Sequence, residues 1–383
     1  MQGIFNKLQG DRTIWFIVMM LSIFSLLAVY SSTGTLAFRQ QGGDTEYYLF
    51  RHFFLLAGGV LLMYLAHLIN FNYYSRIAQL MLYISIPLLL ITLAFGTDIH
   101  DARRWLTVPI IDISFQTSDL AKLALIMYVA RILSRKQHII DDFDQGFLPV
   151  IIPVLLVCVL IMPADLSSAL LLFFTCLIVM FIGRVRLKHM GLAIWMGITV
   201  FMLVIAISSF TSYEGRLGTW KNRIANFMDD SEGESYQVVQ SKIAIANGGL
   251  VRLAPGKSVQ RNFLPHPYSD FIYAIIIEEY GLLGGLMVMV LYLWLLQRAI
   301  RIFVKSPGAF GALLAVGLAI SLVIQAMMNM AVTVNLLPVT GLTLPLVSMG
   351  GTSLLFTSVS IGIILSVSRY IEQQAEDVSL VSA

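Results

Sequence analysis

The sequence predicts an all-α, polytopic membrane protein with about ten transmembrane helices and one large extracytoplasmic loop between the seventh and eighth. Apolar residues make up 58% of the 383 positions and charged residues only 12%, about half the roughly 25% of an ordinary soluble domain. The mean hydropathy of +0.82 agrees. Because such a chain cannot cover a soluble surface with polar groups, we expect a single membrane domain over residues 1–383.

The apolar runs place the individual spans. A bilayer core of about 30 Å needs about 20 apolar helical residues. The candidate runs are 14–31, 53–69, 77–95, 120–133, 147–162, 166–182, 190–210, 271–296, 310–334 and 344–367. The fourth run is short, and we expect its helix to begin earlier, near Ser118.

The distribution of Lys and Arg among the short loops sets the orientation. One side of the membrane carries 13 of them: Lys7, Arg12, Arg76, Arg131, Arg135, Lys136, Arg184, Arg186, Lys188, Arg298, Arg301, Lys305 and Arg369. The other side carries 4, namely Arg39, Arg51, Arg103 and Arg104. Cytoplasmic loops are the ones enriched in these residues. The bias predicts that both termini are cytoplasmic.

The loop over residues 211–270 is then extracytoplasmic, and its sequence predicts internal structure. Apolar residues recur at helical spacing over 236–247, and two glycines follow as a stop signal. Basic residues around Trp220 also stand at helical spacing beside aromatics, which is typical of an interfacial helix. No soluble catalytic domain is recognisable, so we expect any chemistry to take place in or on the helix bundle.

Charged residues at the predicted outer ends of the spans are the candidate functional residues, because charge near a membrane is costly. Asp119 and Lys122 share a helix face at the start of span four. Asp165 lies in the tight turn between spans five and six, and Asp270 precedes span eight. Structural interpretations remain open for each: a helix-start ion pair for the first two and helix caps for Asp165 and Asp270.

Other charged residues have the same two interpretations. Arg103 and Arg104 stand beside Trp105 and are either interfacial anchors or cations for a bound anion. Glu278 and Glu279 lie deeper, about 12 Å along span eight. They are either structural partners of a buried cation or part of a transport path.

Several other functions are excluded. The net charge of +3 gives no basis for nucleic-acid binding. The glycine before Gly256-Lys257-Ser258 has the wrong spacing for a P-loop. The six histidines are scattered, and both cysteines lie singly in apolar runs, so zinc binding has no support.

Four segments give the chain a family resemblance. The strongest is NMAVTVNLLPVTGLTLPLVSMGGTSLLF at 329–356, followed by RNFLPHPYSDFIYAIIIEEYGLLGG at 261–285, ARRWL at 102–106 and SFQTSDLAKLALI at 114–126. Together they resemble the SEDS family (FtsW/RodA/SpoVE) of bacterial shape, elongation, division and sporulation proteins, and most closely its cell-division branch. The resemblance covers nearly the whole chain. The sequence departs from the family pattern at two places. Asp119 stands where Glu is usual, and the turn at 163–168 keeps the family's acid as Asp165 but lacks its glycine.

The resemblance implies a peptidoglycan glycosyltransferase that polymerises lipid II, an undecaprenyl-diphosphate-linked substrate, during septal wall synthesis. It places the reaction at the outer leaflet of the cytoplasmic (inner) membrane. It implies a class B penicillin-binding protein as partner, together with other membrane proteins of the division machinery. The family's essential aspartate falls on Asp270, and its other implicated polar positions fall on Asp119, Lys122 and Asp165.

The chemistry of the residues is compatible with this function. Sugar transfer from a lipid diphosphate needs a base for the attacking hydroxyl and positive charge for the leaving group. Asp270 is the candidate base or, alternatively, the ligand of a divalent cation, Mg²⁺ or Mn²⁺. Lys122, Arg103 and Arg104 are candidate diphosphate ligands. Two competing functions remain open, a lipid II flippase and a non-catalytic scaffold of the division machinery, and a transporter would place its polar site near the midplane.

Overall fold

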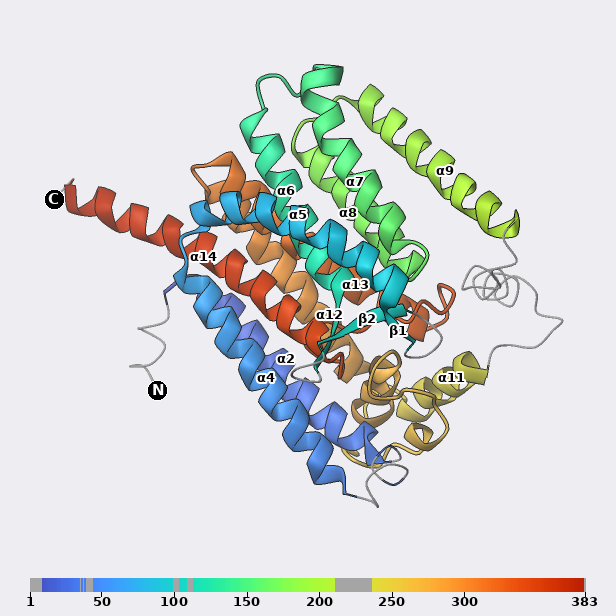
Figure 1. The fold of residues 1–383 in the computed structure, drawn as a ribbon. Coiled ribbons are helices and arrows are strands. Elements are labelled where there is room, and N and C mark those ends of the chain that lie inside the picture. Colours follow the sequence, from blue (N-terminus) through green and yellow to red (C-terminus); the bar gives the residue numbers. More distant parts are fainter. Residues whose placement is uncertain are drawn as a thin grey trace.

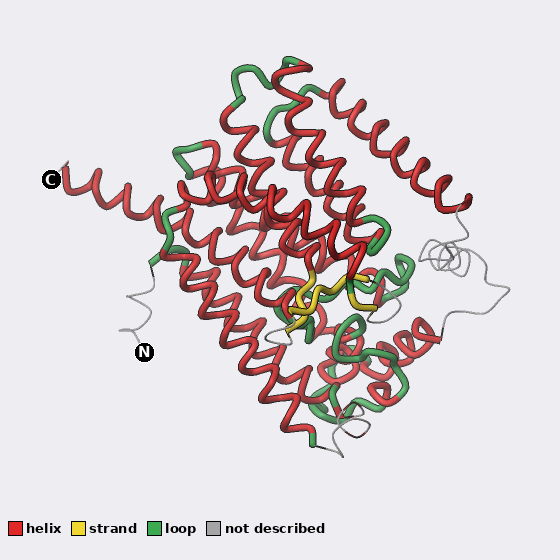
Figure 2. The backbone as a smooth tube through the Cα atoms, in the orientation of Figure 1, coloured by secondary structure: helices red, strands yellow, loops and turns green. Residues whose placement is uncertain are grey.

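The structure is a computed structural model that describes residues 9–34, 36, 38, 44–98, 103–108, 113–210 and 236–381. It is a bundle of long helices with a small sheet at one end (Figure 1, Figure 2). The main helices are α2 (Arg12–Ser32), α4 (Thr45–Leu68), α5 (Phe71–Phe95), α6 (Thr117–Arg135), α7 (Leu148–Ile161), α8 (Leu166–Ile182), α9 (Leu187–Phe210), α11 (Tyr236–Gly248), α12 (Ile272–Lys305), α13 (Ala309–Thr333) and α14 (Thr352–Val381). A π-helical turn, Phe143–Phe147, leads directly into α7.

The described helices confirm the predicted fold class. Eight of the described segments are long and apolar enough to cross a membrane, and each overlaps a predicted span. The two remaining predictions, 120–133 and 166–182, correspond to α6 and α8, which contain 19 and 17 residues. As expected, α6 begins earlier than its apolar run, at Thr117. The chain is therefore a multi-pass membrane protein.

The predicted start of the last span was wrong. Residues 344–351 are not helical, and α14 begins only at Thr352. The run is apolar, but it contains Pro345 and ends in Gly350-Gly351, which are poor helix formers. The eighth span is also longer than predicted, since α12 runs to Lys305.

A three-stranded antiparallel sheet was not predicted. Its strands are β1 (Thr97–Asp98), β2 (Arg103–Val108) and β3 (Ile113–Gln116), in the order β1-β2-β3. β2 pairs with β3 from Trp105 opposite Gln116 to Val108 opposite Ile113. The sheet lies at the same end of the bundle as α11 and the start of α12 (Figure 1). The antiparallel pairing brings β2 back beside the start of α6.

The predicted helix in the large loop is confirmed, because α11 spans Tyr236–Gly248. Gly248 lies against α12 so closely that an added Cβ would stand 2.1 Å from the carbonyl oxygen of Ile277. Only glycine allows this approach. The second predicted helix of the loop, around Trp220, lies outside the described residues.

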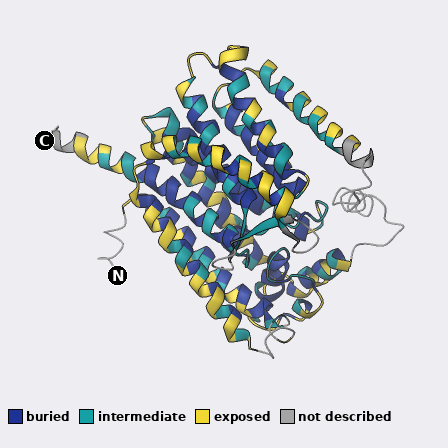
Figure 3. Ribbon diagram, viewed as in Figure 1, coloured by how far each residue is buried: buried dark blue, intermediate teal, exposed yellow. Residues whose placement is uncertain are grey.

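The core of the bundle is formed around α13. In the most apolar 18-residue stretch of α13, 83% of the residues are buried. The corresponding value is 6% for α9, which lies at the edge of the bundle (Figure 3). α13 is rich in alanine and glycine, and small residues let membrane helices approach closely. At Gly317, for example, an added Cβ would meet Ile126 of α6 and Val179 of α8 at 3.2 and 3.1 Å.

Between α13 and α14 the chain passes through the bundle without regular structure. We call residues 334–351 the re-entrant segment. Non-helical backbone at membrane depth needs partners for its polar groups. Side chains of the surrounding helices supply them: Gln325 Nε2 donates to the carbonyl of Thr343 at 2.9 Å, Ser25 Oγ donates to that of Val347 at 2.9 Å, and Tyr292 donates to that of Pro345.

Candidate active site

Asp270 lies immediately before α12, but its side chain does not cap the helix. The N-cap position is Phe271, and no side chain bonds to the first turn there. The capping interpretation of Asp270 is therefore wrong. The side chain is half-buried, and its Oδ1 accepts a hydrogen bond from Ser269 Oγ at 2.9 Å. Because the carboxylate of Asp270 is partly accessible and does not cap a helix, it is available for chemistry.

Asn329 of α13 fixes the backbone at Asp270. Its Nδ2 donates to the carbonyl oxygen of Asp270 at 2.9 Å and to that of Leu342 at 2.6 Å. Asn329 is only 2% exposed, and within the described part of the chain its Oδ1 is a buried atom without a partner. One buried amide thus joins the candidate base to the re-entrant segment.

Two further hydrogen bonds join the residues before Asp270 to the re-entrant segment. Ser348 Oγ donates to the carbonyl of Ser269 at 2.6 Å, and the N–H of Met349 donates to the carbonyl of Tyr268 at 2.9 Å. Three successive carbonyls before α12 are therefore held by α13 and the re-entrant segment. The position of the carboxylate depends on segments that are distant in sequence.

Asp119 and Lys122 form the predicted ion pair in the first turns of α6. Lys122 Nζ lies 2.7 Å from Asp119 Oδ1, and the two side chains are 12% and 5% exposed. Asp119 Oδ2 is buried and has no partner among the described residues. Lys122 has three donor hydrogens, so this pairing leaves donors for a ligand.

Asp165 and Arg104 form a second pair. Asp165 is the N-cap of α8, where its Oδ1 accepts from the N–H of Ser168 at 3.1 Å, so the capping interpretation is confirmed. Its Oδ2 also lies 3.1 Å from Nη1 of Arg104 on β2, whose Nε donates to the carbonyl of Ala164 at 2.9 Å. Arg103 precedes Arg104 on β2, but its side chain lies outside the described residues.

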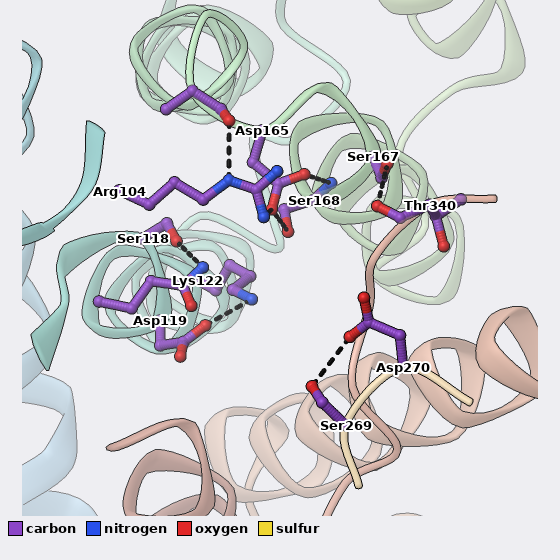
Figure 4. A network of polar contacts seen from close by, with 12 residues as sticks. Arg104, Ser118, Asp119, Lys122, Asp165, Ser167, Ser168, Ser269, Asp270 and Thr340 are labelled. Atoms are coloured by element: carbon purple, nitrogen blue, oxygen red, sulfur yellow. Dashed lines mark hydrogen bonds and ion pairs between the residues drawn. The ribbon is translucent and has the colours of Figure 1, made fainter. Parts of the chain in front are cut away.

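The structure brings five of the predicted residues together, Asp119 among them. In Figure 4 the side chains of Arg104, Lys122, Asp165 and Asp270 point toward one another from β2, α6, the start of α8 and the turn before α12. Two acids are held in ion pairs with the two cations, and Asp270 stands opposite them without a cation of its own in this view. The arrangement combines one available carboxylate with two positive groups.

Glu278 and Glu279 have a different role. The N–H groups of Val259 and Ser258 donate to Glu278 and Glu279, respectively, each at 3.1 Å. The hydroxyl of Ser258 also donates to Glu278, and that of Ser31 donates to Glu279. These buried acids therefore fasten the large loop to α12 and α2 mainly through neutral donors. The predicted partnership with a buried cation is not their main interaction.

Sequence reasoning missed the supporting residues around Asp270. Asn329 and Ser348 lie within the recognised segment 329–356, but their apolar neighbours make that segment resemble a plain span. Tyr268 was also missed. Burial raises the pKa of its phenol, and the nearby Tyr48 and Asp270 raise it further. The phenol therefore remains a neutral hydrogen-bonding group beside the candidate base.

Metal binding by protein groups alone has little support in the described chain. Among the described residues no three His, Cys, Asp or Glu side chains stand close enough to share an ion. Mg²⁺, however, is commonly held by one or two carboxylates together with substrate phosphates and water. Asp270 fits a cation only in that second manner.

The chain is similar in sequence to known proteins over nearly its whole length. The family model of the FtsW/RodA/SpoVE "cell cycle protein" matches residues 11–373. Stage V sporulation protein E of Bacillus subtilis (strain 168) is 33% identical over 373 residues, which are 95% of this chain and 98% of that protein. The probable peptidoglycan glycosyltransferase FtsW of Coxiella burnetii (strain RSA 493 / Nine Mile phase I) is 31% identical, covering 92% of this chain and 95% of the relative.

Solved structures show the same fold. A chain from a peptidoglycan synthase complex, solved to describe the structural coordination of polymerization and crosslinking, superposes with a TM-score of 0.74 at 24% identity, covering 95% of this chain and 99% of that one. The rod shape determining protein RodA of Thermus thermophilus gives a TM-score of 0.68 at 24% identity, with 95% and 98% covered. On the family model and the two curated relatives, this chain belongs to the FtsW/RodA/SpoVE family.

Proposed function

We propose that this protein is a peptidoglycan glycosyltransferase that polymerises lipid II at the outer face of the cytoplasmic membrane. The observation that carries the proposal is the convergence of Asp270 with the cations Arg104 and Lys122 at one end of the bundle. The names of the curated FtsW relatives support the reaction type. The positive-inside bias of the loops supports the outer location of this end.

Each charged residue has a separate role in the proposed reaction. A sugar hydroxyl of the acceptor attacks the anomeric carbon of the donor, and Asp270 takes the proton of that hydroxyl as the new C–O bond forms. The bond from the anomeric carbon to the diphosphate oxygen breaks, and negative charge gathers on the diphosphate. Lys122 and Arg104 stabilise that charge. Arg103, the neighbour of Arg104 in sequence, adds positive charge to β2.

Asp119 and Asp165 position these cations. Each is almost completely buried and paired, at 2.7 Å to Lys122 and 3.1 Å to Arg104. A cation held by a fixed carboxylate loses less freedom when it binds a ligand. The alternative role of Asp270 is that of a metal ligand: together with the diphosphate oxygens it would hold Mg²⁺ or Mn²⁺, and the cation would supply the charge stabilisation.

The proposed partner and the proposed cellular process are taken from relatives of this chain. A class B penicillin-binding protein is the proposed partner, because the related synthase complex joins polymerization with crosslinking. Septal wall synthesis, together with other membrane proteins of the division machinery, is the proposed process, because the curated FtsW relatives match over nearly their full length.

The test is polymerisation by the purified full chain. Lipid II is supplied in detergent, with and without the penicillin-binding partner, and the products are separated by size. Glycan strands are the expected result. If none form with the partner present, while vesicles containing the protein translocate labelled lipid II, the chain is a flippase and the proposal is wrong. Failure of both assays, with the partner still bound, would identify a scaffold.

A further inference from the structure

Three arginines gather where α5 begins and α6 ends, at the end of the bundle opposite the sheet. Arg76 lies on α5, and Arg131 and Arg135 lie on α6, which packs along α5 (Figure 1). We call these three residues the arginine cluster. The charges of Arg76 and Arg135 both act on Arg131. Because like charges repel, and do so at i, i+4 positions of one helix, an anion shared by the three would stabilise the arrangement.

No carboxylate neutralises the arginine cluster within the described part of the chain. The ion pairs of the described residues do not include any of its members. The first two acids that follow α6 in sequence are engaged elsewhere: Asp141 pairs with Arg186 at 2.8 Å, and Asp142 accepts from the N–H of Gln145 at 2.8 Å. The described chain therefore supplies three positive charges here and no counter-ion.

Arg131 is the most buried member of the cluster, at 7% exposed. Among the described residues its guanidinium donates only to a neutral group, the main-chain carbonyl of Ser75 on α5. A guanidinium carries five N–H donors, and a buried charge is costly unless an opposite charge pairs with it. The remaining donors of Arg131 therefore favour an anion bound where α5 and α6 meet.

Two tyrosines continue the cluster toward the middle of the membrane. Tyr83 follows Arg76 by seven residues on α5, and Tyr128 precedes Arg131 by three on α6, so each shares a helix face with its arginine. The two phenols interact electrostatically with each other and with Arg131. Tyr83 is 58% exposed, and Gln79 Nε2 donates to its oxygen at 3.1 Å, so the phenolic hydrogen is available to a ligand. Exposed tyrosine next to arginine is typical of the level where headgroups meet acyl chains.

We propose that the arginine cluster binds the phosphate of an anionic phospholipid in the inner leaflet. The positive-inside bias of the loops supports that leaflet, and basic sites between membrane helices on the cytoplasmic side bind anionic headgroups. The planar donors of arginine match phosphate oxygens, and Tyr83 donates to an ester oxygen of the same lipid. The site lies nine residues, about 14 Å, from Lys122 along α6. It is therefore separate from the candidate active site and does not rest on the proposed function.

The test is lipid retention by the purified full chain, counted by native mass spectrometry in a neutral detergent with added phosphatidylglycerol or phosphatidylcholine. The parent should bind one phosphatidylglycerol at least about tenfold more tightly than phosphatidylcholine. The double variant Arg76→Gln/Arg135→Gln changes two exposed positions and should bind phosphatidylglycerol about tenfold more weakly than the parent. The matched control is Arg301→Gln/Lys305→Gln, which removes two exposed cations four residues apart at the same end of α12. It should bind within about twofold of the parent, because a site, unlike general attraction, depends on particular cations.

Three results would overturn the proposal. Equal affinity of the parent for the two phospholipids would mean that the cluster is only solvated. An equal loss in the control and in the double variant would mean a general attraction of cations to anionic lipid. Displacement of phosphatidylglycerol by a much lower concentration of polyprenyl diphosphate would assign the site to a lipid-linked substrate instead. If the double variant does not fold, Tyr83→Phe replaces it, with an expected weakening of about threefold for one lost hydrogen bond.

Discussion

Asn329 and Asp270 are joined by a hydrogen bond of 2.9 Å from the side-chain amide of Asn329 to the main-chain carbonyl of Asp270. The same amide bonds to Leu342 of the re-entrant segment at 2.6 Å. The position of the candidate base is therefore determined from the centre of the bundle, by the most buried of the membrane helices. The side chain of Asp270 remains free of helix capping.

We expect Asn329→Ala to lower both stability and polymerisation. The change leaves two carbonyl oxygens without their donor at a buried position, which costs about 2–4 kcal/mol of unfolding free energy. The measurement is thermal unfolding together with polymerisation of lipid II. Thr175→Val is the control, because that buried hydroxyl bonds only to the backbone of its own helix. Parental activity of Asn329→Ala would show that the bond to Asp270 has no positioning role.

Lys122→Ala should reduce polymerisation by about 100-fold or more. It removes a cation from the leaving group, and loss of one such group from an active site costs about 3 kcal/mol of transition-state stabilisation. Lys122→Arg should recover only part of the activity, because the two cations differ in shape and hydration. Initial rates at saturating lipid II measure both. Full activity of the alanine variant would return Lys122 to a purely structural ion pair with Asp119.

Arg104→Ala should destabilise the protein by about 3 kcal/mol, because it leaves the carboxylate of Asp165 buried and unpaired. Arg104→Lys should recover part of the stability and lose the bond from Nε to Ala164. Thermal unfolding of the three proteins makes the comparison. Equal stability of the parent and Arg104→Ala would mean that water replaces the guanidinium at Asp165.

The predicted sidedness can be tested with single cysteines. Leu253 in the large loop between α9 and α12 is 84% exposed, and Gln137 at the opposite end of the bundle is exposed as well. In intact spheroplasts an impermeant thiol reagent should label Leu253→Cys and leave Gln137→Cys unlabelled. The native Cys158 and Cys176 are buried and provide no background. Labelling of Gln137→Cys without lysis would contradict the orientation.

The helices were predictable from sequence because long apolar runs have few alternatives in a membrane. The sheet was not, since residues 97–116 join polar and apolar residues in short stretches whose pairing depends on the neighbouring helices. The re-entrant segment was hidden for the opposite reason. Its residues are as apolar as a span, and its open backbone is tolerable because side chains of the surrounding helices bond to it, among them Ser25, Gln325 and Tyr292.

Part of the candidate site was predictable from sequence because it lies at the ends of apolar runs. Asp119, Lys122 and Asp165 stand at helix starts that the apolar runs locate. The pairing of Asp165 with Arg104 requires the unpredicted sheet, which carries the arginine. The dependence of Asp270 on Asn329 crosses 59 positions of sequence and follows only from how α12 and α13 pack.

The catalytic role of Asp270 is tested most directly by the rate at which purified Asp270→Asn protein polymerises lipid II with its penicillin-binding partner bound. Asparagine keeps the volume of the side chain and removes its basicity and charge. Since the parent side chain caps no helix, folding should be unaffected. We expect a loss of at least about 100-fold in rate, the typical contribution of a general base, with normal membrane insertion and partner binding. Polymerisation by Asp270→Asn at the parental rate would contradict the assignment of Asp270 as the catalytic carboxylate.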